Sequence, residues 1–396
     1  MAGKWDWLKD EIKGFKSLSK LPLLLKFIKG KVKGPGDVTK CTLCPNMCRH
    51  ACPIGIVDGR ETTSPSGKSR IGLLIQQQKL SMNKDTMYPV YMCLSCGCCE
   101  KWCPFDFSVS DILRPIKENF VKKNKIYDEF KKVVNNLEKH DYVYDDFKTN
   151  NIETQKRVES KGKVLYLSGC SFRENFPDVP QKAVEIIENL GYEIETITEE
   201  KCCGIPAYHI GDMEAFNRLS SRQTKNLNQS DVDFIVTSCP SCAYAYRVLY
   251  PENGDHIIKP EVYHFVEFFE EKQRGLKLSE SKEKKYTYHD PCKLVHGLNK
   301  ADSVKKILQQ IPGINLIKPR RNGEKTFCCG YGGSTVNRLD PELSDEIAVE
   351  RLNELMDFSK NIVTACPTCK QAFEKNKKTE DIKIIDISEL IFDLME

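Results

Sequence analysis

Apolar runs and amphipathic stretches alternate through the second half of the chain. Residues 163–170, KVLYLSGC, and residues 233–240, DFIVTSCP, are short apolar runs that end in turn residues, which is typical of buried strands. Between them, residues 178–191, DVPQKAVEIIENLG, repeat apolar positions at helical spacing, and residues 192–197, YEIETI, have a strand pattern. Strands that alternate with helices predict right-handed β-α-β units and a parallel sheet.

The same order of patterns returns further along the chain. A strand, a helix and two more strands are predicted at residues 285–292, 302–313, 314–319 and 361–367. We therefore predict a duplicated α/β domain, and we expect functional residues at the carboxyl ends of its parallel strands.

Composition narrows the class of protein. The chain has 396 residues, of which 40% are hydrophobic and 29% charged, as in soluble globular proteins. No apolar run is long enough to span a membrane, and the charged start MAGKWDWLKDEIKGFKSLSK does not resemble a secretory signal. The 19 cysteines are therefore expected to be reduced and to bind metal. Because bound thiolates are negative, the formal charge of +4 gives no reason to expect nucleic-acid binding.

Two groups of four cysteines each end in Cys-Pro. The second group matches the bacterial ferredoxin pattern, and the first departs from it by one extra residue between Cys44 and Cys48. In that pattern the fourth cysteine of each run binds the other cluster, and it is more specific than the isolated Cys-x2-Cys pairs of zinc sites. Residues 69–82 between the runs have a helical pattern, so we predict a helical ferredoxin module, with Cys98 left over. We assign one cubane [4Fe–4S] cluster to Cys41, Cys44, Cys48 and Cys103, and a second to Cys93, Cys96, Cys99 and Cys52.

The other ten cysteines form a repeat of five. Each copy has a single cysteine after a strand, then Cys-Cys-Gly, then Cys-Pro-x-Cys. Five thiolates exceed what a cubane or a zinc ion binds, and adjacent cysteines on an extended backbone point to opposite sides, so a larger or irregular cluster is expected. The first copy is Cys170, Cys202, Cys203, Cys239 and Cys242, and the second is Cys292, Cys328, Cys329, Cys366 and Cys369.

These motifs resemble the cysteine-rich CCG-domain proteins, and most of all the catalytic subunit of heterodisulfide reductase. The resemblance covers roughly residues 38–396. It implies that each complete set of five cysteines binds a noncubane [4Fe–4S] cluster, and that the two clusters flank the disulfide of coenzyme M and coenzyme B in an anaerobic, methanogenic archaeal setting. Lys293 stands where relatives often have His. Similar iron–sulfur subunits of glycolate, lactate and glycerol-3-phosphate dehydrogenases often have one incomplete motif.

Three side chains near the second set are candidates for acid–base or orienting roles. His289 and His296 lie on either side of Cys292 and are candidate proton donors, since imidazole titrates near neutral pH. Structural hydrogen bonding is the alternative role for both. Tyr331, which follows the second Cys-Cys-Gly, is a candidate for orienting a substrate.

The predicted fold is α+β overall, with a helical two-cluster ferredoxin domain ahead of a duplicated α/β CCG domain with parallel sheets. Residues 1–40 contain ten lysines against four acidic residues. This basic segment predicts that residues 1–35 dock on a membrane surface or on a partner protein. The alternative is that the segment packs on the ferredoxin domain. The predicted segments are a basic amphipathic terminus at 1–37, the ferredoxin domain at 38–115, a charged and partly helical linker at 116–162, and CCG domains at 163–275 and 284–396.

These patterns predict a cytoplasmic oxidoreductase subunit, or one that its partner holds at the inner face of the membrane. Electrons from a flavoprotein or a membrane cytochrome would reach a disulfide through two cubane and two noncubane clusters. The main alternative is an electron relay between a 2-hydroxyacid or glycerol-3-phosphate dehydrogenase and a quinone. A structural or storage zinc protein is disfavoured, since cluster spacing accounts for 18 of the 19 cysteines.

Overall fold

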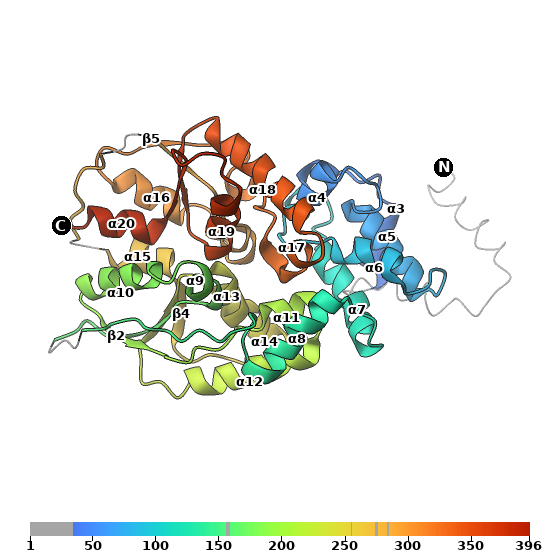
Figure 1. The fold of residues 1–396 in the computed structure, drawn as a ribbon, viewed down its shortest axis with the longest axis horizontal. Helices are drawn as coiled ribbons and strands as arrows, with labels where there is room; N and C mark the ends of the chain where they lie inside the picture. Colours follow the sequence, from blue (N-terminus) through green and yellow to red (C-terminus); the bar gives the residue numbers. More distant parts are fainter. Residues whose placement is uncertain (1–34, 156–158, 255, 274–275, 283–284) are drawn as a thin grey trace, which may run out of the picture.

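Three bodies pack side by side in the computed structural model (Figure 1). A helical ferredoxin module, drawn in blue, lies next to two sheet-containing halves, drawn in green to yellow and in orange to red. The structure describes residues 35–155, 159–254, 256–273, 276–282 and 285–396.

The first half is built on a parallel four-stranded sheet with the order β2-β1-β3-β4. Its strands are β1 (Lys163–Leu167), β2 (Glu193–Thr196), β3 (Phe234–Thr237) and β4 (Glu261–His264). Its helical segments are α9 (Cys170–Asn175), α10 (Val179–Asn189), α11 (Ile205–Ile210), α12 (Met213–Leu227), α13 (Pro240–Tyr244), η4 (Ala245–Leu249), α14 (Tyr250–Glu252) and α15 (Phe265–Lys272).

The second half repeats this topology with the parallel order β6-β5-β7-β8. The predicted pair of parallel sheets is thus confirmed, and each sheet has a last strand, β4 or β8, that the apolar pattern did not predict. The strands are β5 (Lys285–Tyr288), β6 (Asn315–Ile317), β7 (Asn361–Thr364) and β8 (Lys383–Asp386). The helical segments are η5 (Lys293–Gly297), α16 (Ser303–Gln310), η6 (Gly323–Lys325), η7 (Gly332–Ser334), α17 (Val336–Leu339), α18 (Pro341–Met356), α19 (Pro367–Asn376) and α20 (Ile387–Leu394).

The ferredoxin module is helical, as predicted. Short helices carry the cysteine loops, and the longer α5 begins where the Ser64 side chain accepts a hydrogen bond from the Gly67 backbone N–H. The described helical segments are α3 (Pro35–Leu43), η2 (Arg49–Ala51), α4 (Pro53–Val57), α5 (Pro65–Gln76), α6 (Lys84–Tyr91), η3 (Glu100–Trp102) and α7 (Val109–Lys122).

Helix α8 (Asp128–His140) lies within the predicted linker at 116–162 and packs on the first half. It buries Phe130, Val133 and Leu137. The carboxylate of Asp141, just after α8, forms ion pairs with two arginines of α12, Arg218 and Arg222. The predicted domain boundaries stay a prediction, and the docking predicted for residues 1–35 falls almost entirely outside the described residues.

The two halves share one hydrophobic core. Val164 and Tyr166 of β1 belong to the same buried cluster as Tyr286 and Tyr288 of β5. Helix α10 also packs against α20 (Figure 1). This shared core holds the carboxyl ends of the two sheets in a fixed relation. Among the described residues, no helix combines the length and apolar character needed to cross a bilayer.

Candidate metal centres and the cavity between them

The parallel sheet of the first half brings together the five cysteines of the first repeat. Cys170 begins α9 directly after β1, and Cys239 precedes α13 directly after β3. Cys202 and Cys203 come from the loop that leaves β2, and Cys242 lies within α13. Because β2, β1 and β3 are adjacent and parallel, these loops meet at one edge of the sheet.

The five thiols of the first set form a connected chain of contacts. Hydrogen bonds with Cys202 and Cys242 lower the pKa of the Cys203 thiol to about 6. Cys170 is hydrogen-bonded to Cys202, and Cys242 is hydrogen-bonded to Cys239, so each thiol touches the next. No single cysteine of this set lies apart from the others.

The second set repeats this chain of contacts in the second half. The sulfur atoms of Cys292 and Cys328 lie 4.0 Å apart. Hydrogen bonds with Cys328 and Cys369 lower the pKa of Cys329 well below its usual value, and Cys369 is in turn hydrogen-bonded to Cys366. Cys329 therefore holds the same place in its set as Cys203 does in the first.

A glycine follows each Cys-Cys pair because the backbone turns into the left-handed region there. The φ angles are 83° at Gly204 and 87° at Gly330. A Cβ atom at Gly330 would lie 2.7 Å from the backbone oxygen of Ser344. Glycine thus allows the cysteine loop to lie directly on α18.

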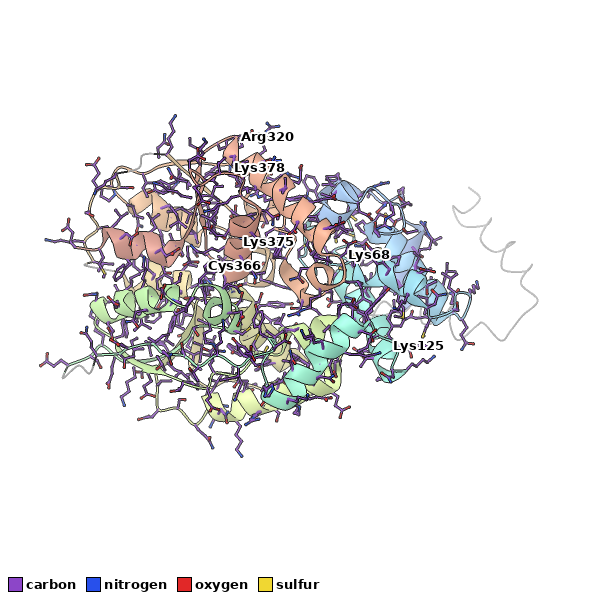
Figure 2. The ribbon with its side chains drawn as sticks, in the orientation of Figure 1. Lys68, Lys125, Arg320, Cys366, Lys375 and Lys378 are labelled. Carbon is purple, nitrogen blue, oxygen red and sulfur yellow. The ribbon has the colours of Figure 1, made fainter. Side chains whose placement is uncertain are left out.

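One cavity separates the two cysteine sets. Figure 2 labels Cys366 at the border between the two halves. The charged side chains that line the cavity, within the part of the chain that is described, are the cations Lys293 and Arg338. The Nε of Arg338 is buried without a hydrogen-bond partner. The lining includes nine of the ten repeat cysteines: Cys170, Cys202, Cys203, Cys239, Cys242, Cys292, Cys329, Cys366 and Cys369.

In the ferredoxin module, cysteines from both runs meet at one enclosed site. Cys52 of the first run lines a cavity with Cys93, Cys96 and Cys99 of the second. Burial raises the pKa of Cys99 well above its usual value, and the nearby thiols of Cys52, Cys96 and Cys93 raise it further. The structure thus brings Cys52 together with the three cysteines of the other run, and the exchange of the fourth ligand stays a prediction.

The other four of the eight predicted ferredoxin ligands gather at a second, less enclosed site. Burial raises the pKa of Cys48 to about 12, and the thiols of Cys41, Cys52 and Cys103 contribute. Burial likewise raises the pKa of Cys41, with contributions from Cys103 and Cys44. Cys44, Cys48 and Cys103 are half-buried, whereas Cys52, Cys93 and Cys96 are buried.

The chemistry of these donor sets fits iron–sulfur clusters. All 19 cysteines lie in the described part of the chain, and none of them is in a disulfide. Buried thiols whose pKa is raised become thiolates at neutral pH only when a cation binds them. Two sets of four suit cubanes, and two sets of five exceed the coordination of zinc.

A buried lysine lies beside the enclosed ferredoxin site. Lys68 of α5 is 1% exposed, and its ammonium group donates a hydrogen bond to the backbone oxygen of Met92. Burial lowers the pKa of Lys68, but the thiolates of Cys52, Cys93 and neighbouring cysteines outweigh this and raise it overall. Figure 2 shows Lys68 within the ferredoxin module.

The leftover cysteine and His296 join the ferredoxin module to the second half. The Cys98 thiol donates to the backbone oxygen of Thr326 at 3.3 Å. The Nδ1 of His296 lies 2.7 Å from the backbone oxygen of Cys96, and its Nε2 lies 3.0 Å from that of Glu324. Both ring nitrogens of His296 thus face carbonyl groups, away from the lining of the cavity.

His289 lies behind the second cysteine set. Its Nδ1 accepts a hydrogen bond from the Nε of Arg351 at 3.1 Å, which places the ring proton on Nε2. A ring nitrogen of His289 and the sulfurs of Cys329 and Cys369 all lie within 4.8 Å of one another. Tyr331 lines the cavity, and its hydroxyl group donates to Asp345. The acid–base and orienting roles of these side chains stay predictions.

Sequence reasoning did not find Lys68, Arg338 or Arg351. One feature of the sequence could have indicated that Lys68 is buried. Gly72 and Ile75 lie four and seven residues after Lys68, so the three share one face of the helix, and that face is buried. Arg338 and Arg351 resemble ordinary surface arginines of amphipathic helices. Their burial depends on long-range packing that the pattern does not encode.

Two family models match the chain. A 4Fe-4S dicluster domain matches residues 37–107, and a cysteine-rich domain named CCG matches residues 164–247 and again residues 286–374. The matched segments contain the two ferredoxin runs and both repeats of five cysteines.

The chain is similar in sequence to components of several oxidoreductases. It is 25% identical over 330 residues to one subunit of the dihydromethanophenazine:CoB–CoM heterodisulfide reductase of Methanosarcina mazei, and the match covers 80% of both chains. It is 27% identical over 228 residues to lactate utilization protein A of an Exiguobacterium species, and this match covers 54% of this chain and 91% of that protein.

A similar fold occurs in a solved structure, that of a hypothetical protein from Helicobacter pylori. The TM-score is 0.56 at 10% sequence identity, and the match covers 98% of this chain and 76% of that protein. At this identity the likeness concerns the fold alone.

Proposed function

The chain is a CCG-domain iron–sulfur protein with a 4Fe-4S dicluster domain, and on that premise we propose that it reduces a disulfide in the cavity between its two cysteine repeats. The observation that carries this proposal is the duplicated contact chain of five thiols, complete in both halves, on either side of one cavity. Cys239 and Cys366, one from each set, lie close enough for the charge of one thiolate to affect the other.

Each site has its proposed ligands. Two cubane [4Fe–4S] clusters take the two groups of four, and two noncubane [4Fe–4S] clusters take the two groups of five. When bound, such clusters supply electrons one at a time, and a disulfide needs two electrons and two protons to become two thiols. The cysteines therefore act as ligands, and no free thiol of the repeats is left to attack the substrate.

The lining of the cavity favours a disulfide that carries acidic groups. Lys293 and Arg338 enter it from η5 and α17, and no carboxylate lies among its lining residues in the described chain. Burial lowers the pKa of Arg338, yet a guanidinium stays charged at neutral pH. Its unpartnered Nε–H would donate to a carboxylate, sulfonate or phosphate. The heterodisulfide of coenzyme M and coenzyme B belongs to this class and is the substrate we propose.

The second candidate is a relay that passes electrons from a 2-hydroxyacid or glycerol-3-phosphate dehydrogenase to a quinone. The similarity to lactate utilization protein A favours it. The two complete sets of five cysteines favour disulfide reduction. In either case we propose a donor or acceptor partner, a flavoprotein or a membrane cytochrome, and a cytoplasmic or peripheral membrane location.

The test is turnover of the coenzyme M–coenzyme B heterodisulfide by the protein purified without oxygen, with reduced methyl viologen as donor. We expect thiol formation that Cys203→Ser and Cys329→Ser each abolish. Cys98→Ser is the matched control and should keep activity. Electron delivery to a quinone without reduction of any disulfide would establish the relay instead.

A further inference from the structure

A groove lies between the ferredoxin module and the first half. Its volume is about 710 Å³, and its walls come from α3, α5 and α7 on one side and from α11 and α14 on the other. A recessed apolar surface that joins two modules is typical of a site where another segment packs. The apolar side chains that line this groove are Val38, Leu73, Phe107, Ile112, Pro115 and Tyr208.

The charged side chains of the groove are mostly acidic. Four carboxylates and one guanidinium line it, namely those of Glu100, Asp106, Asp111, Glu252 and Arg114. Within the described ranges, none of the four carboxylates forms an ion pair. Arg114 is already engaged, because it donates to the Oδ1 of Asn253 at 3.1 Å and lies 5.2 Å above the Tyr208 ring. Even with Lys40, which lies over the Phe107 ring at the edge, acids outnumber cations, so a basic segment is the complement.

Residues 1–34 have the complementary composition, and the chain leaves them at the edge of the groove. They carry nine lysines against three acidic residues, together with the apolar stretches WDWL and LPLLLKFI. Helix α3 begins at Pro35, and Val38 of the same helix lines the groove. A stretch of about ten residues spans roughly 30 Å when extended, so the segment can reach any part of the groove. Because the segment is tethered there, its docking is intramolecular and is favoured by a high effective concentration.

We propose that residues 1–34 dock in this groove, with their apolar side chains on its lining and their lysines beside its carboxylates. The docked segment joins the ferredoxin module to the first half of the chain. It also shields one cysteine site from solvent, because Glu100 and Ser108 line both the groove and the enclosed ferredoxin site. The docking does not depend on which reaction the protein catalyses.

Limited proteolysis of the full-length protein with chymotrypsin tests the docking. Chymotrypsin cuts after large aromatic residues, and it should cut a docked segment slowly, because cleavage waits until the segment leaves the groove. Mass spectrometry of the products separates cuts within residues 1–34 from cuts in the rest of the chain. The aromatic sites within the segment are Trp5, Trp7, Phe15 and Phe27.

We expect D111K/E252K to raise the rate of cleavage within residues 1–34 roughly 10-fold at low salt, because like charges then meet in the groove. Cleavage after residue 35 should stay slow, which shows that the variant is folded. The matched control is E138K/E346K, which reverses two exposed carboxylates outside the groove lining and should keep the wild-type rate.

Four outcomes would overturn the proposal. The first is rapid cleavage within residues 1–34 of the wild type, which would mean that the segment is not docked. The second is slow cleavage that D111K/E252K leaves unchanged or that E138K/E346K accelerates equally, since the groove would then not hold the segment. The third is protection that appears only at protein concentrations where the chain dimerises, which would place the segment on a second copy. The fourth is protection that appears only with anionic lipid vesicles, which would make the segment a membrane anchor.

Discussion

The imidazole Nδ1 of His296 in the second half lies 2.7 Å from the backbone oxygen of Cys96 in the ferredoxin module. The contact is close enough that a Cβ atom on Gly97 would lie 2.9 Å from the Cβ of His296. Cys96 also interacts with Cys328, whose hydrogen bond lowers the Cys96 pKa. The enclosed ferredoxin site therefore adjoins the second half, and electrons would reach the second cysteine set first.

Replacing Lys68 by Met should lower the reduction potential of the second cubane. The buried ammonium group would stabilise the more negative, reduced state of a cluster bound there, and its loss should shift the potential by roughly 50–150 mV. A redox titration followed by electron paramagnetic resonance measures the shift. Lys125→Met removes an exposed lysine near the same module and should leave the potential unchanged (Figure 2). Equal shifts in both variants would contradict a local effect.

Replacing His289 by Leu should lower the potential of the second noncubane cluster only. In the first half, the position equivalent to His289 at the end of the strand is Leu167. The substitution therefore introduces the residue that the first half already has there. The lost N–H faces the sulfurs of Cys329 and Cys369, and we expect a shift of roughly 30–100 mV. A variant that keeps the potential but loses activity would instead indicate the proton-donor role.

Arg338→Gln should weaken binding of acidic disulfides and spare neutral ones. We expect KM for dithiodiglycolate to rise roughly 10-fold with kcat nearly unchanged, as for a lost charge-assisted hydrogen bond. KM for 2-hydroxyethyl disulfide should stay the same. Arg320→Gln is the control, because Arg320 is an exposed arginine outside the cavity lining (Figure 2). A parallel rise for both substrates would point to damage of the site.

Iron content should separate the ligand cysteines from the leftover one. We expect about 16 irons per chain in the wild type, from four four-iron clusters. Cys203→Ser should lose up to about four of them through its noncubane site. Cys98→Ala should lose none, because its thiol bonds to the Thr326 carbonyl. Stoichiometric zinc with little iron would refute the cluster assignment.

Acid should destabilise the first half through His264. Burial lowers the pKa of His264 to about 4, and its usual value is 6.5. The unfolded chain therefore binds a proton at this histidine more readily than the folded chain does. The stability that His264 contributes is complete above pH 6.5 and is lost as the pH falls towards 4. The free energy of unfolding should fall by about 3 kcal/mol over that range. Urea unfolding between pH 4 and 7 should show a shallower pH slope for His264→Gln than for the wild type.

The repeat of strand and helix patterns was sufficient to predict two parallel sheets, because their buried strands read as continuous apolar runs. The strands β4 and β8 were missed because each is followed at once by a helix, α15 or α20, with no turn residue to separate the strand pattern from the helix pattern. Cysteine spacing predicted the four groups, since ligand spacing is local. Lys68, Arg338 and His296 owe their positions to contacts between distant segments, which spacing cannot reveal.

The exchange of cysteines between the two ferredoxin runs has a consequence for biosynthesis. With the proposed ligands, the site that contains Cys41 is completed only by Cys103, and the site that contains Cys93 needs Cys52. A nascent chain that ends before residue 103 therefore lacks a ligand for at least one of the two cubane sites. Iron and sulfide delivered to the nascent chain before that point would meet at least one incomplete ligand set, so we expect both cubane sites to be filled only after residue 103 has left the ribosome.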